Sequence, residues 1–343
     1  MYLYRPHPAS LTTLFGDLEN FAASASRVFV GTPGTILKRS NASGFAFYAH
    51  QYYDALGVKR ERYVAGPIGE EPAEHAVEEL RSRIEELKRL LPSIRLLGRE
   101  GFQLADSRAF ATIAALQNSG LFGAGALLVG SHAYGVILNR LGVRAASYLT
   151  EDVDIARNRR LLVADGKMPL AEILKSSGIE FVEVPSLDRR SPSTSFKQRG
   201  RSTFQVELLA PARGDDIPSA PVPELAAHAV TLPLLGYLLA ESQVTALLAR
   251  EGCSAVRVPL PERFAIHKLI VSQLRRGRDA KAQKDRTQAL VLCAALGDMH
   301  PGALESAVQS VPARARGHLR RAVGQVRQPL ENDHPRAWDE LNA

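Results

Sequence analysis

Two aspartates separated by a single residue lie inside an apolar segment of this chain. The segment reads SYLTEDVDIA over residues 147–156 and contains Asp152 and Asp154. Burying two like charges in a strand is costly unless something compensates them. Because alternate residues of a strand point to the same face, both carboxylates share one face, while Val153 and Glu151 point to the other. Two interpretations are open: the carboxylates converge on a divalent cation, or the strand is an exposed edge with two solvated acids.

A second acidic strand is predicted at residues 202–211, which read STFQVELLAP. Its apolar residues alternate so that Glu207 lies on the other face, where it needs a partner. The site of Asp152 and Asp154 supplies one, and we expect all three carboxylates to be catalytic and to hold two Mg²⁺ ions, with Mn²⁺ as an alternative. Glu207 is also the candidate base for the acceptor's proton. Glu183 is a weaker candidate for the third acid.

An apolar strand at residues 126–130, ALLVG, runs directly into Ser131 and a helix. Glycine allows a phosphate to approach the backbone, the serine adds a hydroxyl, and a helix N-terminus favours an anion. Gly130 and Ser131 are therefore candidate nucleotide-binding residues, although Gly-Ser after a strand is common and no Walker loop follows. Together with the three acids, this pair predicts a two-metal site that acts on a nucleoside triphosphate.

The charge of the chain favours an anionic partner. The net charge is +7, the pI is about 9.5, and basic residues gather at 189–201, 275–286 and 314–327. Three such clusters favour a phosphate-rich partner such as RNA, whereas each cluster alone is equally consistent with a solvated face. No apolar run reaches the roughly 18 residues of a membrane span. Without a secretory pattern or a cysteine framework, we expect a cytoplasmic protein that does not contact membranes.

The pattern of the chain predicts an α/β protein in four parts. We expect a small β-rich module at 1–68 with a β unit at 45–66, a linker helix within 69–100, a mixed-sheet α/β core at 101–245, and a helical C-terminal domain at 246–343. The linker helix shows a narrow heptad stripe over 72–91, and Pro92 is expected to end it. His132 and His267 are expected on helix surfaces.

The order of these motifs carries a family resemblance. VGS, then EDVDIA, then FQVELLAP resembles the polymerase-β superfamily of nucleotidyltransferases, whose signature is Gly-Ser, an acid-x-acid strand and a third acidic strand. The chain is most similar to the bacterial branch that includes AbiEii and MenT-type toxin nucleotidyltransferases, over roughly residues 120–295. It departs from compact members in the longer spacing between Ser131 and Asp152, and in Glu207, where an aspartate is more usual.

The resemblance implies roles for further residues, all of them nucleotide-binding. Lys268 is expected to reach the triphosphate from a helix, and Asp285, after Lys284, to orient Lys268 or a nearby arginine. Lys197 and Arg199, in a basic lead-in to the third acidic strand, are expected to bind the nucleotide or the acceptor backbone.

The sequence therefore favours transfer of a nucleoside monophosphate from an NTP to an acceptor hydroxyl. By resemblance the acceptor is RNA, most plausibly a tRNA 3′ end, while a protein hydroxyl or a small molecule stays open. The resemblance alone implies a toxin or defence role and an antitoxin partner. The alternative is a nucleic-acid-binding protein on a degenerate transferase scaffold, with the β unit at 45–66 and the basic tail as its binding surfaces.

Overall fold

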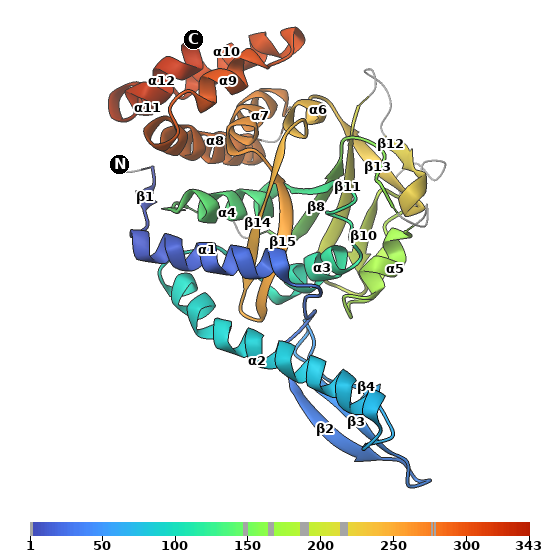
Figure 1. Ribbon diagram of the computed structural model, residues 1–343. Helices are drawn as coiled ribbons and strands as arrows, with labels where there is room; N and C mark the ends of the chain where they lie inside the picture. Colours follow the sequence, from blue (N-terminus) through green and yellow to red (C-terminus); the bar gives the residue numbers. More distant parts are fainter. Residues whose placement is uncertain are drawn as a thin grey trace.

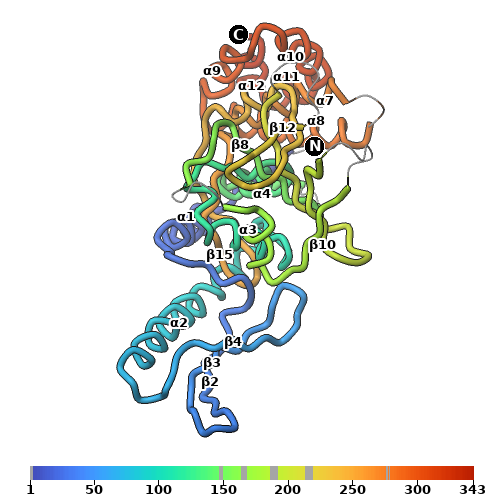
Figure 2. Tube along the Cα trace, turned by 90° about the vertical axis from the view of Figure 1, so that its right-hand side faces the viewer, coloured from blue at the N-terminus to red at the C-terminus, as the bar shows by residue number. Residues whose placement is uncertain are grey.

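The chain folds into an α/β body, a set of C-terminal helices at one end of it, and an arm that projects from the other end (Figure 1). Figure 2 shows the same separation from the side. The computed structural model describes residues 3–146, 150–163, 168–185, 192–212, 219–275, 277 and 279–343. Residues 147–149 of the SYLTEDVDIA segment and parts of the basic clusters at 189–201 and 275–286 lie outside these ranges.

The arm is a three-stranded antiparallel sheet with a long helix packed beside it. Its elements are β2 (Thr35–Ser40), β3 (Ala46–Tyr53), β4 (Lys59–Ala65) and α2 (Glu71–Arg99). The predicted strand pair is confirmed, and β2 adds a third strand. At the β3–β4 turn, Asp54 accepts hydrogen bonds from the backbone N–H groups of Leu56 and Val58 at 2.9 Å and from Arg60 Nε at 2.7 Å. These bonds fix the turn.

The expectation that Pro92 ends the arm helix is wrong. Helix α2 continues through Pro92 to Arg99. Proline removes one helical hydrogen bond and crowds the preceding turn. The residues beyond it compensate, because Ile94 and Leu97 are fully buried in a core shared with Phe15. Tertiary packing therefore overrides the local signal.

The body contains a seven-stranded mixed sheet. Its strands are β6 (Ala126–Val129), β8 (Asp152–Arg157), β9 (Phe181–Glu183), β10 (Ser195–Gln198), β11 (Gln205–Pro211), β12 (Ser219–Val222) and β13 (Ala227–Leu232). Strand β8 pairs antiparallel with β6 and parallel with β11. The other edge of β11 pairs first with β10 and then, after Leu208, with β13. The expected mixed α/β sheet is confirmed.

Short elements and a buried hairpin complete the body. They are β1 (Arg5–Pro6), α1 (Ala9–Ser24), β5 (Leu104–Ala105), α3 (Ser107–Asn118), α4 (Gly130–Leu141), β7 (Val143–Arg144), α5 (Leu170–Lys175), η1 (Pro223–Leu225), α6 (Leu235–Leu238), β14 (Ser242–Ala249) and β15 (Gly252–Pro259). The β14–β15 hairpin spans the predicted boundary at residue 246, so the helical region begins at Pro261 instead. Both strands are largely buried, and a continuous apolar run does not distinguish a strand from a helix.

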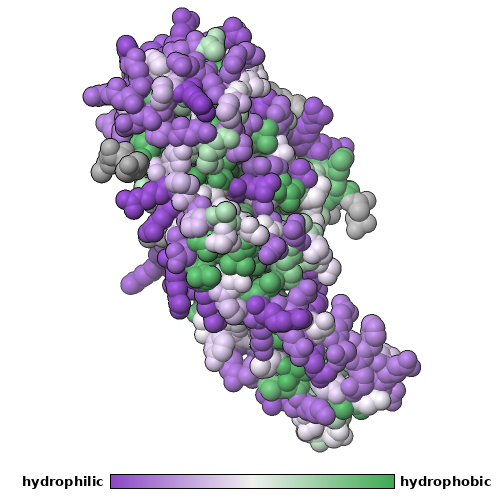
Figure 3. Space-filling view, turned by 60° about the vertical axis from the view of Figure 1, so that its left-hand side comes forward, coloured by the Kyte–Doolittle hydropathy of each residue, from purple (hydrophilic) through white to green (hydrophobic). Residues whose placement is uncertain are grey.

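The C-terminal region is helical. It comprises α7 (Pro261–Leu274), α8 (Asp279–Met299), α9 (Ala303–Gln309), α10 (Ala313–Gln325), α11 (Arg327–Asp333) and α12 (Pro335–Asn342). One hydrophobic cluster joins the sheet, α3, α4 and these helices, so the helical layer is packed on the sheet. Polar side chains cover most of the face shown in Figure 3. Within the described ranges, no helix combines the length and the apolar character needed to cross a membrane.

Candidate functional site

The register of two parallel strands places the three predicted acids on one face of the sheet. Asp154 of β8 is the Cα partner of Glu207 of β11, and Asp152 is the partner of Gln205. Val153 and Ile155, between and after the aspartates, are fully buried on the opposite face. The predicted alternation is thus confirmed, and the exposed-edge interpretation is wrong because β8 has a strand on each side.

The three carboxylates form a charge cluster that the protein leaves partly uncompensated. Burial raises the pKa of Asp154 to about 7, and the charges of Glu207 and Asp152 add to the effect. Burial also raises the pKa of Glu207, and Asp152 again contributes. Glu207 accepts a hydrogen bond from Gln205 Nε2 at 3.0 Å. A raised carboxyl pKa marks a place where a cation is favoured, because a cation relieves the repulsion.

Three lysines from the helical layer face this cluster. The charges of Lys268 and Lys281 lower the pKa of Asp154 against the effect of burial, and Lys281 does the same for Glu207. Burial lowers the pKa of Lys284, as does the charge of Lys268, whereas the charges of Asp154 and Asp152 raise it. Lys281 was not predicted from the sequence. Its spacing of one helical turn before Asp285 is the signal that places it on the same face of α8.

Asp285 connects the two helices that carry these lysines. It is buried, and its carboxylate accepts a hydrogen bond from Lys268 Nζ at 2.7 Å and another from Arg275 Nε. The Lys268 ammonium also lies 5.4 Å from the ring centroid of Phe264. These contacts restrict Lys268 to one orientation at the edge of the acidic face.

Gly130 lies directly against the acidic face. Its φ of +68° is a left-handed conformation, and a Cβ at this position would lie 1.9 Å from Asp154 Oδ2. The position therefore requires glycine for both its backbone and its neighbour. Ser131 follows in the first turn of α4, partly buried, where unpaired helix N–H groups favour an anion.

The middle of the chain matches one known protein family. A family model described as nucleotidyltransferase matches residues 107–313, more than half of the chain. The chain belongs to this nucleotidyltransferase family. No curated protein and no solved structure shows a significant match. The matched range includes Gly130, Ser131, the three acids, Lys268 and Asp285, and it leaves out the whole arm. The protein is thus an enzyme that transfers nucleoside monophosphates.

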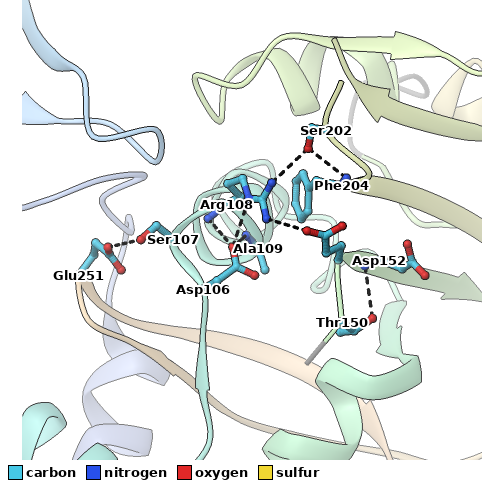
Figure 4. Close-up of polar contacts among 10 residues, drawn as sticks. Asp106, Ser107, Arg108, Ala109, Thr150, Asp152, Ser202, Phe204 and Glu251 are labelled. Atoms are coloured by element: carbon cyan, nitrogen blue, oxygen red, sulfur yellow. Dashed lines mark hydrogen bonds and ion pairs between the residues drawn. The ribbon is translucent and has the colours of Figure 1, made fainter. Parts of the chain in front are cut away.

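A clamp at the start of the two acidic strands of the nucleotidyltransferase was not predicted. Arg108 of α3 donates to Ser202 Oγ at 3.1 Å and to Glu151 Oε1 at 3.4 Å, and its guanidinium carbon lies 5.1 Å from the Phe204 ring centroid. Figure 4 shows Arg108 reaching Ser202 beside Phe204, with the Asp152 carboxylate turned away from it. Glu151 thus points toward Arg108 and away from Asp152 and Asp154, as predicted. Its contact with Arg108 helps to hold the start of β8 in place.

Of the remaining predicted nucleotide-binding residues, Lys197 lies near the acids and Arg199 does not. Lys197 is the Cα partner of Gln205, so it lies on the same face of the sheet as the acids. Arg199 forms an exposed ion pair with Glu180 at 2.5 Å and, within the described part of the chain, does not contact the three acids. Glu183 is the partner of Phe196, on the opposite face. It is therefore excluded as a third acid.

Of the two histidines near the site, His267 is buried, so the expected place on a helix surface is wrong for it, whereas His132 is partly buried. Burial lowers the pKa of His132 to about 4 and that of His267 to about 3. Both rings are therefore neutral near pH 7. His132 follows Ser131 in α4, and His267 precedes Lys268 in α7.

The acids provide the donor chemistry of a cation site without yet forming one. In the described ranges, no three His, Cys, Asp or Glu side chains lie close enough together to enclose a metal ion as they stand. The donors fit nonetheless, since carboxylate oxygens are the ligands that Mg²⁺ prefers and the raised pKa of Asp154 reflects a site where a cation would be favourable.

Proposed function

We propose that this nucleotidyltransferase transfers a nucleoside monophosphate from an NTP to a hydroxyl group at the 3′ end of an RNA, a tRNA foremost. The observation that supports it most is the meeting of three carboxylates with three lysines at Gly130. Asp152, Asp154 and Glu207 would hold two divalent cations, Mg²⁺ first and Mn²⁺ as a substitute. Bound there, the cations would neutralise phosphate charge and lower the pKa of the attacking hydroxyl.

The side chains of the chain have separable tasks in this reaction. The acceptor oxygen forms a bond to the α-phosphorus, and the bond from that phosphorus to the bridging oxygen breaks, which releases pyrophosphate. Glu207 takes the hydroxyl proton, and its raised pKa suits a base that must hold that proton. Gln205 keeps the Glu207 carboxylate oriented through its hydrogen bond.

The lysines and the Gly-Ser turn serve the triphosphate. Lys268, held by Asp285, supplies a fixed positive charge beside the acidic face. Lys281 and Lys284 add two more from α8, and the charge that develops on departing pyrophosphate favours such neighbours. The N–H groups at the start of α4, after Gly130, are available to phosphate oxygens.

Two features support an RNA acceptor. The net charge is +7, and α10 presents four exposed arginines and no acid: Arg314, Arg316, Arg320 and Arg321. The resemblance to the AbiEii and MenT-type branch supports the same acceptor, and it is also what supports a cytoplasmic toxin or defence role with an antitoxin partner. Induced expression of the wild-type chain should then arrest growth, whereas the Asp152→Asn variant should not.

The transfer assay uses each α-³²P-labelled NTP with Mg²⁺ and total tRNA. Labelled RNA is expected with the wild type and is lost with Asp152→Asn, with Asp154→Asn and with EDTA. Glu183→Gln is the matched control, because Glu183 lies in the same sheet on the opposite face. Periodate oxidation of the tRNA destroys the 3′ diol and should abolish labelling. Undiminished labelling by the two aspartate variants would refute the proposed site, and labelling of oxidised tRNA would refute the 3′ acceptor.

A further inference from the structure

A cavity of about 290 Å³ lies where the arm meets the body. Its walls come from β3 and β4, from α2, and from the segment 27–32 that leads from α1 to the arm. Three arginines line it, one from each of three elements: Arg27, Arg62 and Arg83. Among the described lining residues, Glu79 is the only acid. The cavity therefore carries an excess of positive charge.

The three arginines share this cavity with one carboxylate, that of Glu79. Arg83 lies with its guanidinium carbon 5.0 Å from the Phe29 ring centroid and donates to the Arg27 carbonyl oxygen at 3.2 Å. No ion pair with an acid is recorded for Arg27, Arg62 or Arg83 within the described chain. Burial lowers the pKa of Arg83, and the charges of Arg27 and Arg62 lower it further, while the charge of Glu79 acts in the opposite direction. An anion placed among them would relieve this repulsion and accept charge-assisted hydrogen bonds.

Aromatic rings stand beside the arginines. His50 stacks on Tyr52 with ring centroids 5.1 Å apart, and its Nε2 lies 2.8 Å from the Pro33 carbonyl oxygen. Burial lowers the pKa of His50, so the ring is neutral near pH 7. Flat rings next to cationic side chains are the elements with which proteins bind unstacked bases and the phosphates that link them.

The walls of the cavity are fixed in the absence of a ligand. Asn118, at the end of α3, exchanges two hydrogen bonds with the backbone of Val28, at 2.7 and 2.8 Å. On the other side, Thr32 exchanges two bonds with the backbone of Tyr53, at 3.0 and 2.9 Å. Gly31 lies so close to β3 that a Cβ would be 2.3 Å from the Tyr53 carbonyl oxygen. A site whose walls are already held loses little freedom on binding.

We propose that this arginine cavity binds the phosphate backbone of a single-stranded segment of the RNA acceptor, at a distance from the catalytic acids. Its volume is near the lower limit of small-ligand pockets, which suits one nucleotide. Helix α3 joins the two sites. Arg108, in its first turn, contacts Glu151 next to Asp152, and Asn118, its last residue, lines the cavity. Twelve residues at about 1.5 Å each give a helix about 18 Å long, so one RNA must extend over several nucleotides to reach both.

The proposal rests on the proposed RNA acceptor but not on the transfer chemistry, so it is tested by binding alone. The full chain carries Asp152→Asn and no NTP is added. Fluorescence anisotropy follows a labelled single-stranded RNA of about 12 nucleotides. The variant Arg27→Ala with Arg62→Ala removes two charges from the cavity. The matched control is Arg89→Ala with Arg95→Ala, which removes two charges from exposed positions of α2 outside it.

The cavity variant should bind the RNA about 10-fold more weakly or worse, and the salt dependence of log K should fall by about 1.4, from two phosphate contacts at about 0.7 each. The control should change neither. Equal binding by both variants would overturn the proposal. The proposal would also be overturned if a nucleoside monophosphate or pyrophosphate displaced the RNA completely and bound as tightly as the RNA does. The cavity would then be a site for a free nucleotide. If RNA binding depends on the cavity while no labelled nucleotide is transferred, only the proposed function fails.

Discussion

Lys268 of α7 and Asp285 of α8 are joined by a hydrogen bond of 2.7 Å, and Asp285 holds Arg275 as well. One buried carboxylate therefore sets the position of a lysine beside the cluster of three acids. The helical layer contributes charge to the site through this contact.

Replacing Lys268 should slow the transfer reaction. Lys268→Met removes a fixed charge beside the departing pyrophosphate, and we expect kcat/KM to fall by about 100-fold. Lys88→Met, at an exposed position of α2, should leave the reaction unchanged. Steady-state kinetics with labelled NTP check both. A Lys268→Met enzyme with normal kcat/KM would remove Lys268 from the proposed mechanism.

Asp285→Asn should act through its two partners. The substitution leaves Lys268 and Arg275 without their shared carboxylate, so the midpoint of thermal unfolding should fall by several degrees, for a loss of about 1–3 kcal/mol. The KM for NTP should rise as Lys268 loses its orientation. Lys268→Met combined with Asp285→Asn should show no further rise in KM. Additive effects in this double mutant would mean that Asp285 does not work through Lys268.

Gly130→Ala tests the contact between the Gly-Ser turn and Asp154. The added methyl group would displace the Asp154 carboxylate, so transfer should fall by about 100-fold or more, and the left-handed backbone should cost about 1 kcal/mol of stability. Gly120→Ala is a close control, because Gly120 has a φ of +77° with open space around its Cα. It should show the same loss of stability with normal transfer. Equal activity of the two variants would contradict the close approach.

The stability of the metal-free protein should depend on the ionisation of Asp154. Its folded pKa of about 7 lies above the value near 3.9 of an unfolded aspartate, so the folded state binds the extra proton between these values. Stability therefore falls as pH rises from about 4 to 7. The difference in unfolding temperature between the wild type and the Asp154→Asn variant, measured from pH 4 to 7, isolates this effect. Mg²⁺ at pH 8 should raise the unfolding temperature of the wild type more than that of the variant. If the unfolding temperatures of the metal-free wild type and variant differ by the same amount at every pH, the raised pKa of Asp154 is contradicted.

Arg108 is expected to position the acidic strands without touching the substrate. Arg108→Ala frees Ser202 and Glu151, and we expect kcat to fall about 10-fold while the KM for NTP changes little. Arg140→Ala removes an ion pair with Glu19 at 2.6 Å, at the end of α4 remote from the Gly-Ser turn, and should keep full activity. A rise in KM alone would show that Arg108 binds the nucleotide instead.

The sequence predicted the features that depend on local alternation. The period of two places Asp152, Asp154 and Glu207 on one face, because a buried strand leaves no freedom in which side chains point inward. Pro92 and the hairpin at 242–259 were misinterpreted because burial, which decides both, is set by segments far apart in the chain.

The site residues that were not predicted from the sequence were missed for the same reason. Arg108 and Lys281 act on strands that lie about 40 to 125 residues away in sequence, and no local pattern marks such partners. Glu183 was a weaker candidate than Glu207 from the sequence, and only the register with β10 places it on the other face. The arginine cavity combines residues 27, 62 and 83 from three elements, so it exists only once the arm has folded.

The change of partner along β11 has a consequence for how such enzymes diversify. One edge of β11 is held by β8 over residues 205–209, while the other is shared between β10, which precedes it in the chain, and β13, which follows it. Changes in β10 and changes in β13 therefore affect different parts of the same edge of β11. The distance between the Asp154 and Glu207 backbones is unaffected by either. The outer strands of the sheet can thus diverge while the parallel pairing that aligns the two acids is kept.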